Sequence, residues 1–264
     1  MTTATTSTSS VTTEKVGPCT VQVWQTGSGS GLLYLHGYEQ HPGAAPFLER
    51  LGQHRDVRAP ETPGYGESTG LEDIQDILDL ALLWRSLIES WGFESVDVVG
   101  HSLGGMVAAE LAVIAPHRVR KLVLVDSYGL WLDDMPLVDQ FGLSPSALAA
   151  AKWHDPAAAP DPEPSAQSDR SPLGTAIFRT RNLGSATKFM WPIPDRGLRR
   201  RLPHLTVPTL VLHGESDGLV PVAYAQELAS RIPDAKLVTI PGAGHLPMIE
   251  AEDAFVSAVT AFLD

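Results

Sequence analysis

The sequence has little of three features that mark common protein classes. Cys19 is the only cysteine among 264 residues, so no intramolecular disulfide can form, which fits the reducing cytoplasm. Lys and Arg number 19 against 31 Asp and Glu, and a net charge of −12 argues against a nucleic-acid partner. No apolar run approaches the length of a membrane span. We therefore expect a globular, cytoplasmic protein.

The N-terminus also lacks the parts of a secretory signal. Residues 1–13 are rich in Thr and Ser, with no basic region and no apolar core. We predict that residues 1–15 form a disordered polar tail. The remaining length suits one large α/β domain, or such a core with an inserted segment.

The rest of the chain alternates short apolar runs with amphipathic segments. The run at 19–25 alternates apolar and polar residues, which is typical of an antiparallel edge strand. Later runs are continuously apolar, as expected for strands buried on both faces. Strands are predicted at 19–25, 32–36, 55–59, 96–99, 118–125, 209–213 and 236–240, and helices at 46–53, 74–91, 221–232 and 251–263, with a further helix after residue 102.

This alternation predicts an α/β fold, a mainly parallel sheet with helices on both faces. It stops between residues 127 and 203, where a Pro- and Ala-rich stretch occupies 156–172. We predict a core made of 16–126 and 204–264. The 127–203 insertion is predicted to be a mostly helical lid with a flexible loop near 156–172.

The strongest local signal is a turn between an apolar strand and a small-residue helix. It reads Gly100-His101-Ser102-Leu103-Gly104, a G-x-S-x-G pattern. In this context the pattern is typical of a nucleophile elbow, which exposes a serine hydroxyl above the sheet. The helix that follows directs its free amides at the same point, which favours a developing negative charge. We predict that Ser102 is a nucleophile.

A serine nucleophile needs a base, and the base needs an acid that orients it. His245 lies in a Gly-rich loop after the last predicted strand, where it can reach the sheet edge. Asp217 follows the strand at 209–213 and is the leading candidate for the acid. Asp126, at the end of an earlier strand, competes for that role. The order Ser102, Asp217, His245 is the order of the α/β-hydrolase triad.

Two backbone amides are expected to bind the oxyanion of the reaction. One is the amide of Leu103, directly after the nucleophile. The other is the amide of Tyr38, in the loop after the strand at 32–36, where Gly37 allows a close approach.

With these motifs the chain resembles the α/β-hydrolase superfamily, in particular its lid-bearing serine esterase-like branch. The resemblance implies a Ser-His-Asp triad with no cofactor and no metal. It covers nearly the whole chain outside the insertion. It rests on Leu35-His36-Gly37, Pro63-Gly64-Tyr65-Gly66-Glu67-Ser68, Gly100 to Gly105, Pro208 to Asp217, and Gly244-His245.

Departures from related branches narrow the chemistry. Epoxide hydrolases and haloalkane dehalogenases of this superfamily use an aspartate where this chain has Ser102. Carbon–carbon bond hydrolases of the meta-cleavage type usually have Asn before the nucleophile and Trp after the histidine. Here those positions hold His101 and Leu246. That branch therefore stays open only as an alternative, as do lactonases and cofactor-free perhydrolases.

We therefore predict a serine hydrolase that cleaves an ester-type bond of a small, partly apolar substrate through an acyl-enzyme. In the carbon–carbon alternative, Arg179 or Arg181 binds a substrate carboxylate. A ligand-binding receptor with slow turnover is the alternative from another class, and a homodimer stays open. The apolar preference rests on aromatic and sulfur residues of the insertion, which could equally form its own core: Trp131, Trp153, Phe189, Met190 and Trp191.

Overall fold

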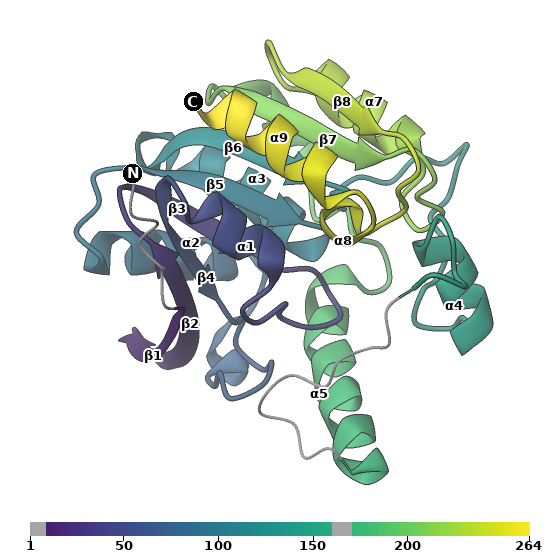
Figure 1. Ribbon diagram of the computed structural model, residues 1–264, viewed down its shortest axis with the longest axis horizontal. Coiled ribbons are helices and arrows are strands. Elements are labelled where there is room, and N and C mark those ends of the chain that lie inside the picture. The colour runs from purple at the N-terminus through teal and green to yellow at the C-terminus, as the bar shows by residue number, and fades with distance from the viewer. Residues whose placement is uncertain (1–8, 160–170) are drawn as a thin grey trace, which may run out of the picture.

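A computed structural model describes residues 9–159 and 171–264 and shows the sheet in Figure 1. Eight strands lie in the order β1-β2-β4-β3-β5-β6-β7-β8. Strand β2 pairs antiparallel with β1 and β4, and all other neighbours are parallel. The strands are β1 Ser10–Val16, β2 Cys19–Gly27, β3 Ser30–Leu35, β4 Arg55–Pro60, β5 Val96–His101, β6 Val119–Val125, β7 Thr209–Gly214 and β8 Lys236–Ile240. The predicted α/β class with a mainly parallel sheet is confirmed.

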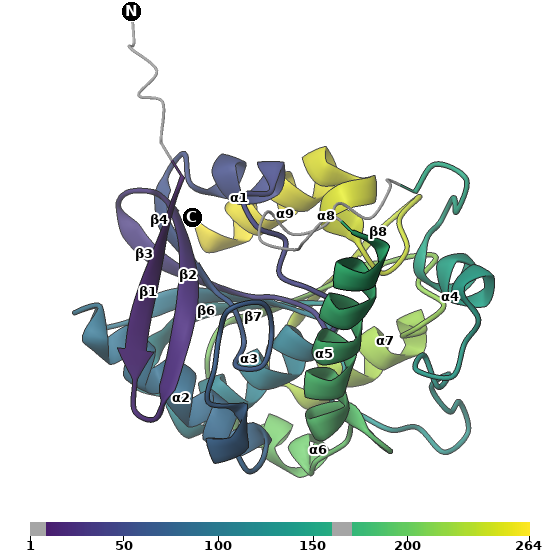
Figure 2. The same ribbon diagram turned by 90° about the horizontal axis from the view of Figure 1, so that it is seen from below.

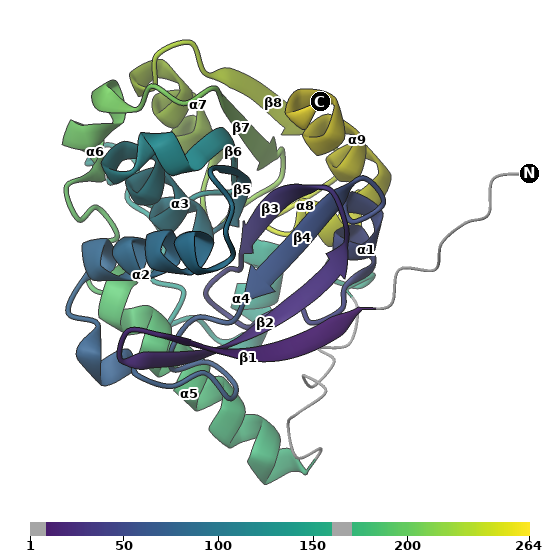
Figure 3. The ribbon, with the colours of Figure 1, turned by 90° about the vertical axis from the view of Figure 1, so that its left-hand side faces the viewer.

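Helices cover both faces of this sheet, as Figure 3 shows. Two separate apolar clusters fill the two layers between helices and sheet. One layer holds α1 Pro46–Leu51, α8 Pro247–Glu250 and α9 Glu252–Leu263, and the other holds α2 Ile77–Ser90, α3 Leu103–Ile114 and α7 Val222–Arg231. Short 3-10 turns lie at η1 Leu71–Asp73, η2 Pro116–Arg118 and η3 Leu202–His204.

The central strands are buried, and most of their side chains are apolar on both faces. Every residue of β5 and β7 is buried, as expected for strands covered by helices on either side. Helix α2 begins at Ile77 rather than at the predicted residue 74. The Asp76 carboxylate accepts hydrogen bonds from the amides of Leu78 and Asp79 and so caps the helix there.

The predicted tail is wrong in its last part, because Ser10–Val16 forms strand β1. The chain turns at Gly17, directly after this strand, and β1 pairs along its whole length with β2. Its side chains are mostly exposed, so the sequence shows no apolar alternation there. Thr and Val nevertheless suit an edge strand, where backbone pairing needs no buried face. Residues 1–8 of the predicted tail lie outside the described residues.

The chain between β6 and β7 adds α4 Pro145–Lys152, α5 Pro172–Met190 and α6 Leu198–Arg201. Helices α4 and α5 stand outside the sheet and its two helical layers (Figures 1 and 2). Most of the loop predicted at 156–172 lies outside the described residues. Within residues 9–159 and 171–264, no helix combines the length and the apolar character needed to cross a membrane.

Candidate active site

The turn between β5 and α3 holds Ser102 in a conformation that few residues adopt. Its φ is 58° and its ψ is −118°, a strained backbone for a residue with a side chain. Such a turn brings the start of α3 against strand β3. A Cβ at Gly104 would lie 2.2 Å from the carbonyl oxygen of Leu35, so only glycine fits there. This packing explains why the sequence places small residues around Ser102.

Three of the residues singled out in the sequence meet in one hydrogen-bonded chain. The hydroxyl of Ser102 lies 2.9 Å from His245 Nε2. On the other side of the ring, Nδ1 lies 2.7 Å from Asp217 Oδ2. All three side chains are buried. The arrangement allows Ser102 to donate its proton to Nε2 while Nδ1–H donates to the carboxylate.

Asp217 is built to remain ionised despite its burial. Its Oδ1 accepts the amide hydrogens of Leu219 and Val220 at 2.8 and 2.9 Å. Burial by itself would raise the pKa of Asp217. The attraction and hydrogen bond of His245, with smaller help from His213 and the Val220 amide, outweigh it and hold that pKa below its usual value.

The loop after β3 passes directly beside Ser102. A Cβ at Gly37 would lie 2.7 Å from His101 Nδ1 and 3.2 Å from Ser102 Cβ. The next residue is Tyr38, and Leu103 is the first residue of α3. Neither amide donates to another residue in the part of the chain that the structure describes. Both predicted oxyanion donors are therefore close to the serine and unused.

Side chains hold this loop in place. The Thr62 amide donates to His36 Nε2 at 3.0 Å, so the ring proton sits on Nδ1 and is donated to the Gly37 carbonyl at 2.8 Å. That carbonyl shares its peptide plane with the Tyr38 amide, so His36 also sets the direction of the amide. The Tyr65 hydroxyl donates to the Tyr38 carbonyl at 2.7 Å.

The insertion contacts the loops that carry the acid and the base. At the end of α4, the carbonyl of Ala151 accepts the amide hydrogen of Gly218 at 2.8 Å. The next carbonyl, that of Lys152, accepts the amide hydrogen of His245 at 2.7 Å. The Lys152 ammonium also lies 2.9 Å from a carboxylate oxygen of Glu39, in the loop after Tyr38. One turn of α4 thus contacts both sides of the site.

Sequence reasoning missed two aromatic residues of the insertion beside the site. The ring of Tyr128 packs edge-on against His245, with centroids 5.8 Å apart. Phe141 packs in the same way against Tyr38 at 6.1 Å. Of the insertion residues singled out in the sequence, Trp153, Phe189 and Met190 are buried, and Trp191 is half exposed. No motif marks Tyr128 or Phe141, because their positions depend on how the insertion folds back.

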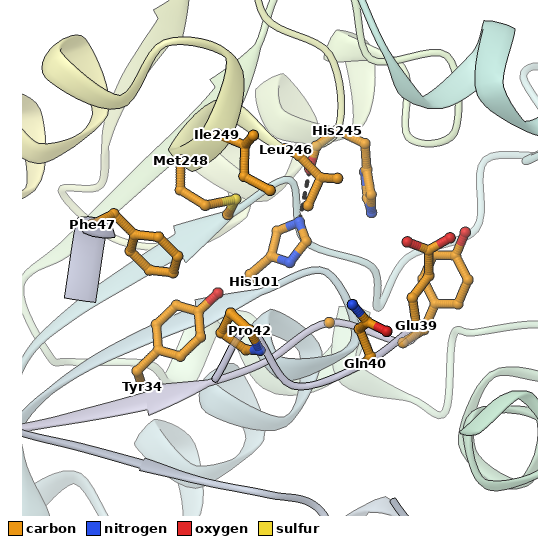
Figure 4. Close-up of a pocket in the computed structure, with 12 residues that line it drawn as sticks. Tyr34, Glu39, Gln40, Pro42, Phe47, His101, His245, Leu246, Met248 and Ile249 are labelled. Carbon is orange, nitrogen blue, oxygen red and sulfur yellow. Dashed lines mark hydrogen bonds between the residues drawn. The ribbon is translucent and has the colours of Figure 1, made fainter. Parts of the chain in front are cut away.

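A cavity of about 110 Å³ lies beside His101 and His245 (Figure 4). His101 Nε2–H donates to the His245 carbonyl at 2.7 Å. Burial lowers the pKa of His101 to about 3, so the ring is neutral. In Figure 4 the Tyr34 hydroxyl points into the same space. The cavity is lined mainly by apolar groups, including Phe47, Leu246, Met248 and Ile249, with Glu39 and Gln40 at one side.

A metal site can be tested against the same residues. Within the described ranges, one cluster of His and acidic ligand atoms lies within 4.8 Å: Asp126, Asp217 and His245. However, both ring nitrogens of His245 already lie within hydrogen-bond distance of Ser102 and Asp217. These donor atoms are used within the protein. The absence of a metal and of a cofactor stays a prediction.

Comparison with known proteins identifies the family of the chain. Residues 32–258 match the sequence profile of the alpha/beta hydrolase family. The chain therefore belongs to the α/β-hydrolase family. Among its curated relatives is a pimeloyl-[acyl-carrier protein] methyl ester esterase of Vibrio vulnificus strain YJ016, which is 31% identical over 90% of this chain and 96% of its own length. The prediction of a hydrolase of the carboxylesterase type is confirmed.

Solved structures show the same fold at lower identity. A bacterial membrane phospholipase A superimposes with a TM-score of 0.81 and 22% identity, covering 97% of this chain and 86% of that protein. The naproxen esterase of Bacillus subtilis gives a TM-score of 0.76 at 17% identity, covering 98% of this chain and 93% of that protein. These likenesses support the fold and leave the substrate open.

Proposed function

We propose that this protein hydrolyses a carboxylic ester of a small, partly apolar substrate through an acyl-enzyme. In this proposal Ser102 is the nucleophile, His245 the base and Asp217 the acid that orients the base. The observation that carries the proposal is the hydrogen-bonded chain of 2.9 and 2.7 Å through the imidazole ring. A buried serine has no structural need for a histidine that is itself held by a buried carboxylate.

The first half of the reaction forms the acyl-enzyme. Ser102 Oγ attacks the ester carbonyl carbon while His245 Nε2 takes its proton. The carbonyl oxygen becomes an oxyanion and accepts hydrogen bonds from the amides of Leu103 and Tyr38. The C–O bond to the alcohol then breaks, and the imidazolium gives its proton to the leaving alkoxide. Asp217 keeps its negative charge throughout and stabilises the imidazolium.

The second half releases the acid. Water enters the place of the alcohol, and His245 removes one of its protons as the oxygen attacks the acyl carbon. The same amides bind the second oxyanion. The bond to Ser102 Oγ then breaks, and Oγ recovers its proton from His245. The acid leaves and the site returns to its starting state, with no cofactor consumed.

The insertion at 127–203 is proposed to act as a lid over this site. Ser102 is fully buried and His245 nearly so, and Tyr128 and Phe141 of the insertion lie beside the site. An ester can reach the serine only if part of this cover moves. The core is proposed to comprise 16–126 and 204–264.

Two observations support a substrate with a small apolar part. The cavity beside His101 and His245 is mainly apolar and has room for only a few carbon atoms. Curated relatives such as the Vibrio vulnificus protein carry the name of a methyl ester esterase, so a small alcohol group is our first choice. We place an apolar part of the substrate in this cavity.

The experiment compares the wild type with Ser102→Ala on p-nitrophenyl esters of increasing acyl length and on methyl esters of the same acids. Ser86→Ala, on the exposed side of α2, is the matched control. We expect Ser102→Ala to lose about 10⁶ in kcat, as for other triad members, and the control to keep full activity. An inactive wild type whose Ser102 also resists a fluorophosphonate probe would contradict the proposal and favour the receptor alternative.

Carbon–carbon bond hydrolysis stays a prediction without a supporting observation. Arg179 and Arg181, the two candidates for a substrate carboxylate, have exposed side chains on α5. Meta-cleavage hydrolases are among the similar solved structures, but at 20% identity the likeness supports the fold alone. Lactone and perhydrolysis substrates belong in the same substrate screen.

A further inference from the structure

Asp126, the weaker candidate for the triad acid, lies directly beside the triad. It follows the last residue of β6, has a φ of 44° and is fully buried. Its amide donates to the Leu212 carbonyl at 3.1 Å, and its Oδ1 accepts the Gly214 amide hydrogen at 2.8 Å. Both bonds tie Asp126 to β7, the strand that leads to Asp217. The reaction proposed above gives this side chain no task.

The second oxygen of Asp126 has no hydrogen-bond partner among the residues that the structure describes. Oxygen and nitrogen atoms of Asp126, Asp217 and His245 lie within 4.8 Å of one another. Two buried carboxylates at such a distance cannot both be ionised at low cost, because their like charges repel with little screening. One shared proton removes the repulsion and turns the unpartnered oxygen into a donor.

The surroundings decide which carboxylate holds the proton. Asp217 accepts two amide hydrogens and faces His245, which favours its charge. Asp126 accepts one amide hydrogen, and the other acidic groups that act on it are Asp217 and Glu250. Burial, and then the charge of Asp217, raise the pKa of Asp126 well above its usual value. The proton therefore belongs to Asp126.

The position of His213 agrees with this assignment. Its Nε2 lies 2.7 Å from the Val220 carbonyl and must donate there, so a neutral ring has a bare Nδ1. That nitrogen has no partner in the described structure and lies 3.4 Å from Asp126 Oδ1. Burial lowers the pKa of His213 and keeps the ring neutral. An ionised Asp126 would face this lone pair, whereas a protonated one adds no negative charge.

We propose that Asp126 is a positioning residue that carries a proton beside the Asp217–His245 pair and becomes the carboxylate of the site when Asp217 is neutralised. The inference rests on the proposed triad. With Asn at 217, the side-chain oxygen keeps the place of Oδ1 and accepts the amide hydrogens of Leu219 and Val220, so the NH2 group takes the place of Oδ2 beside His245. Asp126, which no longer faces a second carboxylate, then releases its proton to solvent. The negative charge of the site then lies on Asp126 instead of on residue 217.

The test is a double-mutant cycle on Asp126→Asn and Asp217→Asn. We expect Asp126→Asn alone to cost at most about tenfold in kcat/KM, the worth of one neutral hydrogen bond. Asp217→Asn should cost about 10², and the double variant about 10⁴, the loss known for a triad without its acid. Asp126→Asn thus costs much more when residue 217 is neutral. Equal costs in both backgrounds would overturn the proposal.

A pH profile separates this role from a merely structural one. We expect kcat/KM of Asp217→Asn to rise with pH through an additional ionisation, that of Asp126, which the double variant lacks. Asp97→Asn is the matched control, because Asp97 is a fully buried aspartate in β5 that pairs with Arg120 away from the site. The loss of kcat/KM caused by Asp97→Asn should be the same with Asp or Asn at position 217. The variant should also leave the pH profile unchanged.

Two further measurements distinguish a failure of the Asp126 proposal from a failure of the ester proposal. The same double-mutant cycle can be measured without an ester substrate, from the rate at which a fluorophosphonate probe labels Ser102. If labelling follows the expected pattern while no ester is hydrolysed, the ester proposal fails and the assignment of Asp126 stands. If Asp126→Asn does not fold, isotope-edited infrared spectra of the wild type at pH 7 decide. A buried protonated aspartic acid supports the proposal, and spectra with only ionised aspartates overturn it.

Discussion

The two sides of the candidate site are held in place by different means. On one side, His245 and Asp217 are fixed by side-chain hydrogen bonds and by the carbonyls at the end of α4. On the other side, the amide of Tyr38 is oriented through neutral His36 and the hydroxyl of Tyr65. The triad side depends on one negative charge, and the oxyanion side depends on uncharged groups. The two sides should therefore respond differently to mutation, acid and salt.

The largest expected effect comes from removing the base. We predict that His245→Ala lowers kcat by about 10⁶, because Ser102 is then left without a proton acceptor. About 10³–10⁴ of rate enhancement over water should remain, because the oxyanion amides are untouched. Single-turnover hydrolysis of an activated ester measures both numbers. His117→Ala, at an exposed position, is the control. A loss below tenfold would contradict the role of His245.

The next largest effect comes from disturbing the oxyanion side alone. We predict that Gly37→Ala lowers kcat by about 10²–10³, the usual cost of one oxyanion donor. The new methyl group would lie 2.7 Å from His101 Nδ1 and would push the Tyr38 amide away from Ser102. Gly184→Ala, where a methyl group meets nothing within 4 Å, is the matched control. Unchanged kcat with normal folding would show that Tyr38 is no donor.

Acid should destabilise the protein through two neutral histidines of the site: His36, which orients the Tyr38 amide, and His101, which donates to the His245 carbonyl. Burial lowers the pKa of His36 to about 4 and that of His101 to about 3. Below the unfolded value of about 6.5, the unfolded chain binds protons that the folded chain does not. The contribution of each neutral histidine to the free energy of unfolding is therefore fully present above that value. It falls as the pH drops toward 4, by up to about 1.4 kcal/mol per pH unit for each histidine. Urea unfolding at pH 7, 6 and 5 measures the slope.

The variant His36→Asn measures how much His36 contributes to the pH dependence of the unfolding free energy. His36→Asn can still donate to the Gly37 carbonyl, but it has no proton to take up. We expect a shallower dependence of the unfolding free energy on pH than in the wild type. His54→Asn, at an exposed position, should keep the wild-type slope. An identical slope in all three proteins would mean that other groups cause the acid sensitivity.

The sequence predicted the parts of the site that local rules govern. Ser102 follows from small residues on a strand-to-helix turn, and His245 from a Gly-rich loop after the last strand. Asp217 and Asp126 both follow a strand at the same edge of the sheet, with Asp217 the leading candidate, and the structure gives His245 a hydrogen bond to Asp217. The parallel sheet followed from continuous apolar runs, because such strands need cover on both faces.

Other parts depend on contacts that no local pattern encodes. Strand β1 was missed because its side chains face solvent and only its backbone pairs with β2. Tyr128 and Phe141 reach the site because the insertion folds back over it. The Lys152 carbonyl contributes through the end of a helix, and any residue type could supply it. Tertiary placement decides these positions, so a single sequence carries no mark of them.

The smallest expected effect concerns the ion pair that joins the two sides. Lys152 of α4 pairs with Glu39, and the exposed fractions of the two side chains are 14% and 33%, respectively. A partly exposed pair contributes about 0.2–1 kcal/mol, so Lys152→Met should change kcat/KM by at most about fivefold at low salt. Methionine keeps an unbranched apolar side chain but also removes the ammonium that lies 5.0 Å from the centre of the Trp153 ring. Because salt screens the pair, wild type and variant should converge as salt rises, whereas Lys236→Met, at an exposed position, should match the wild type at every salt concentration. A difference that persists in high salt would mean that Lys152 positions the loops through packing rather than through its charge.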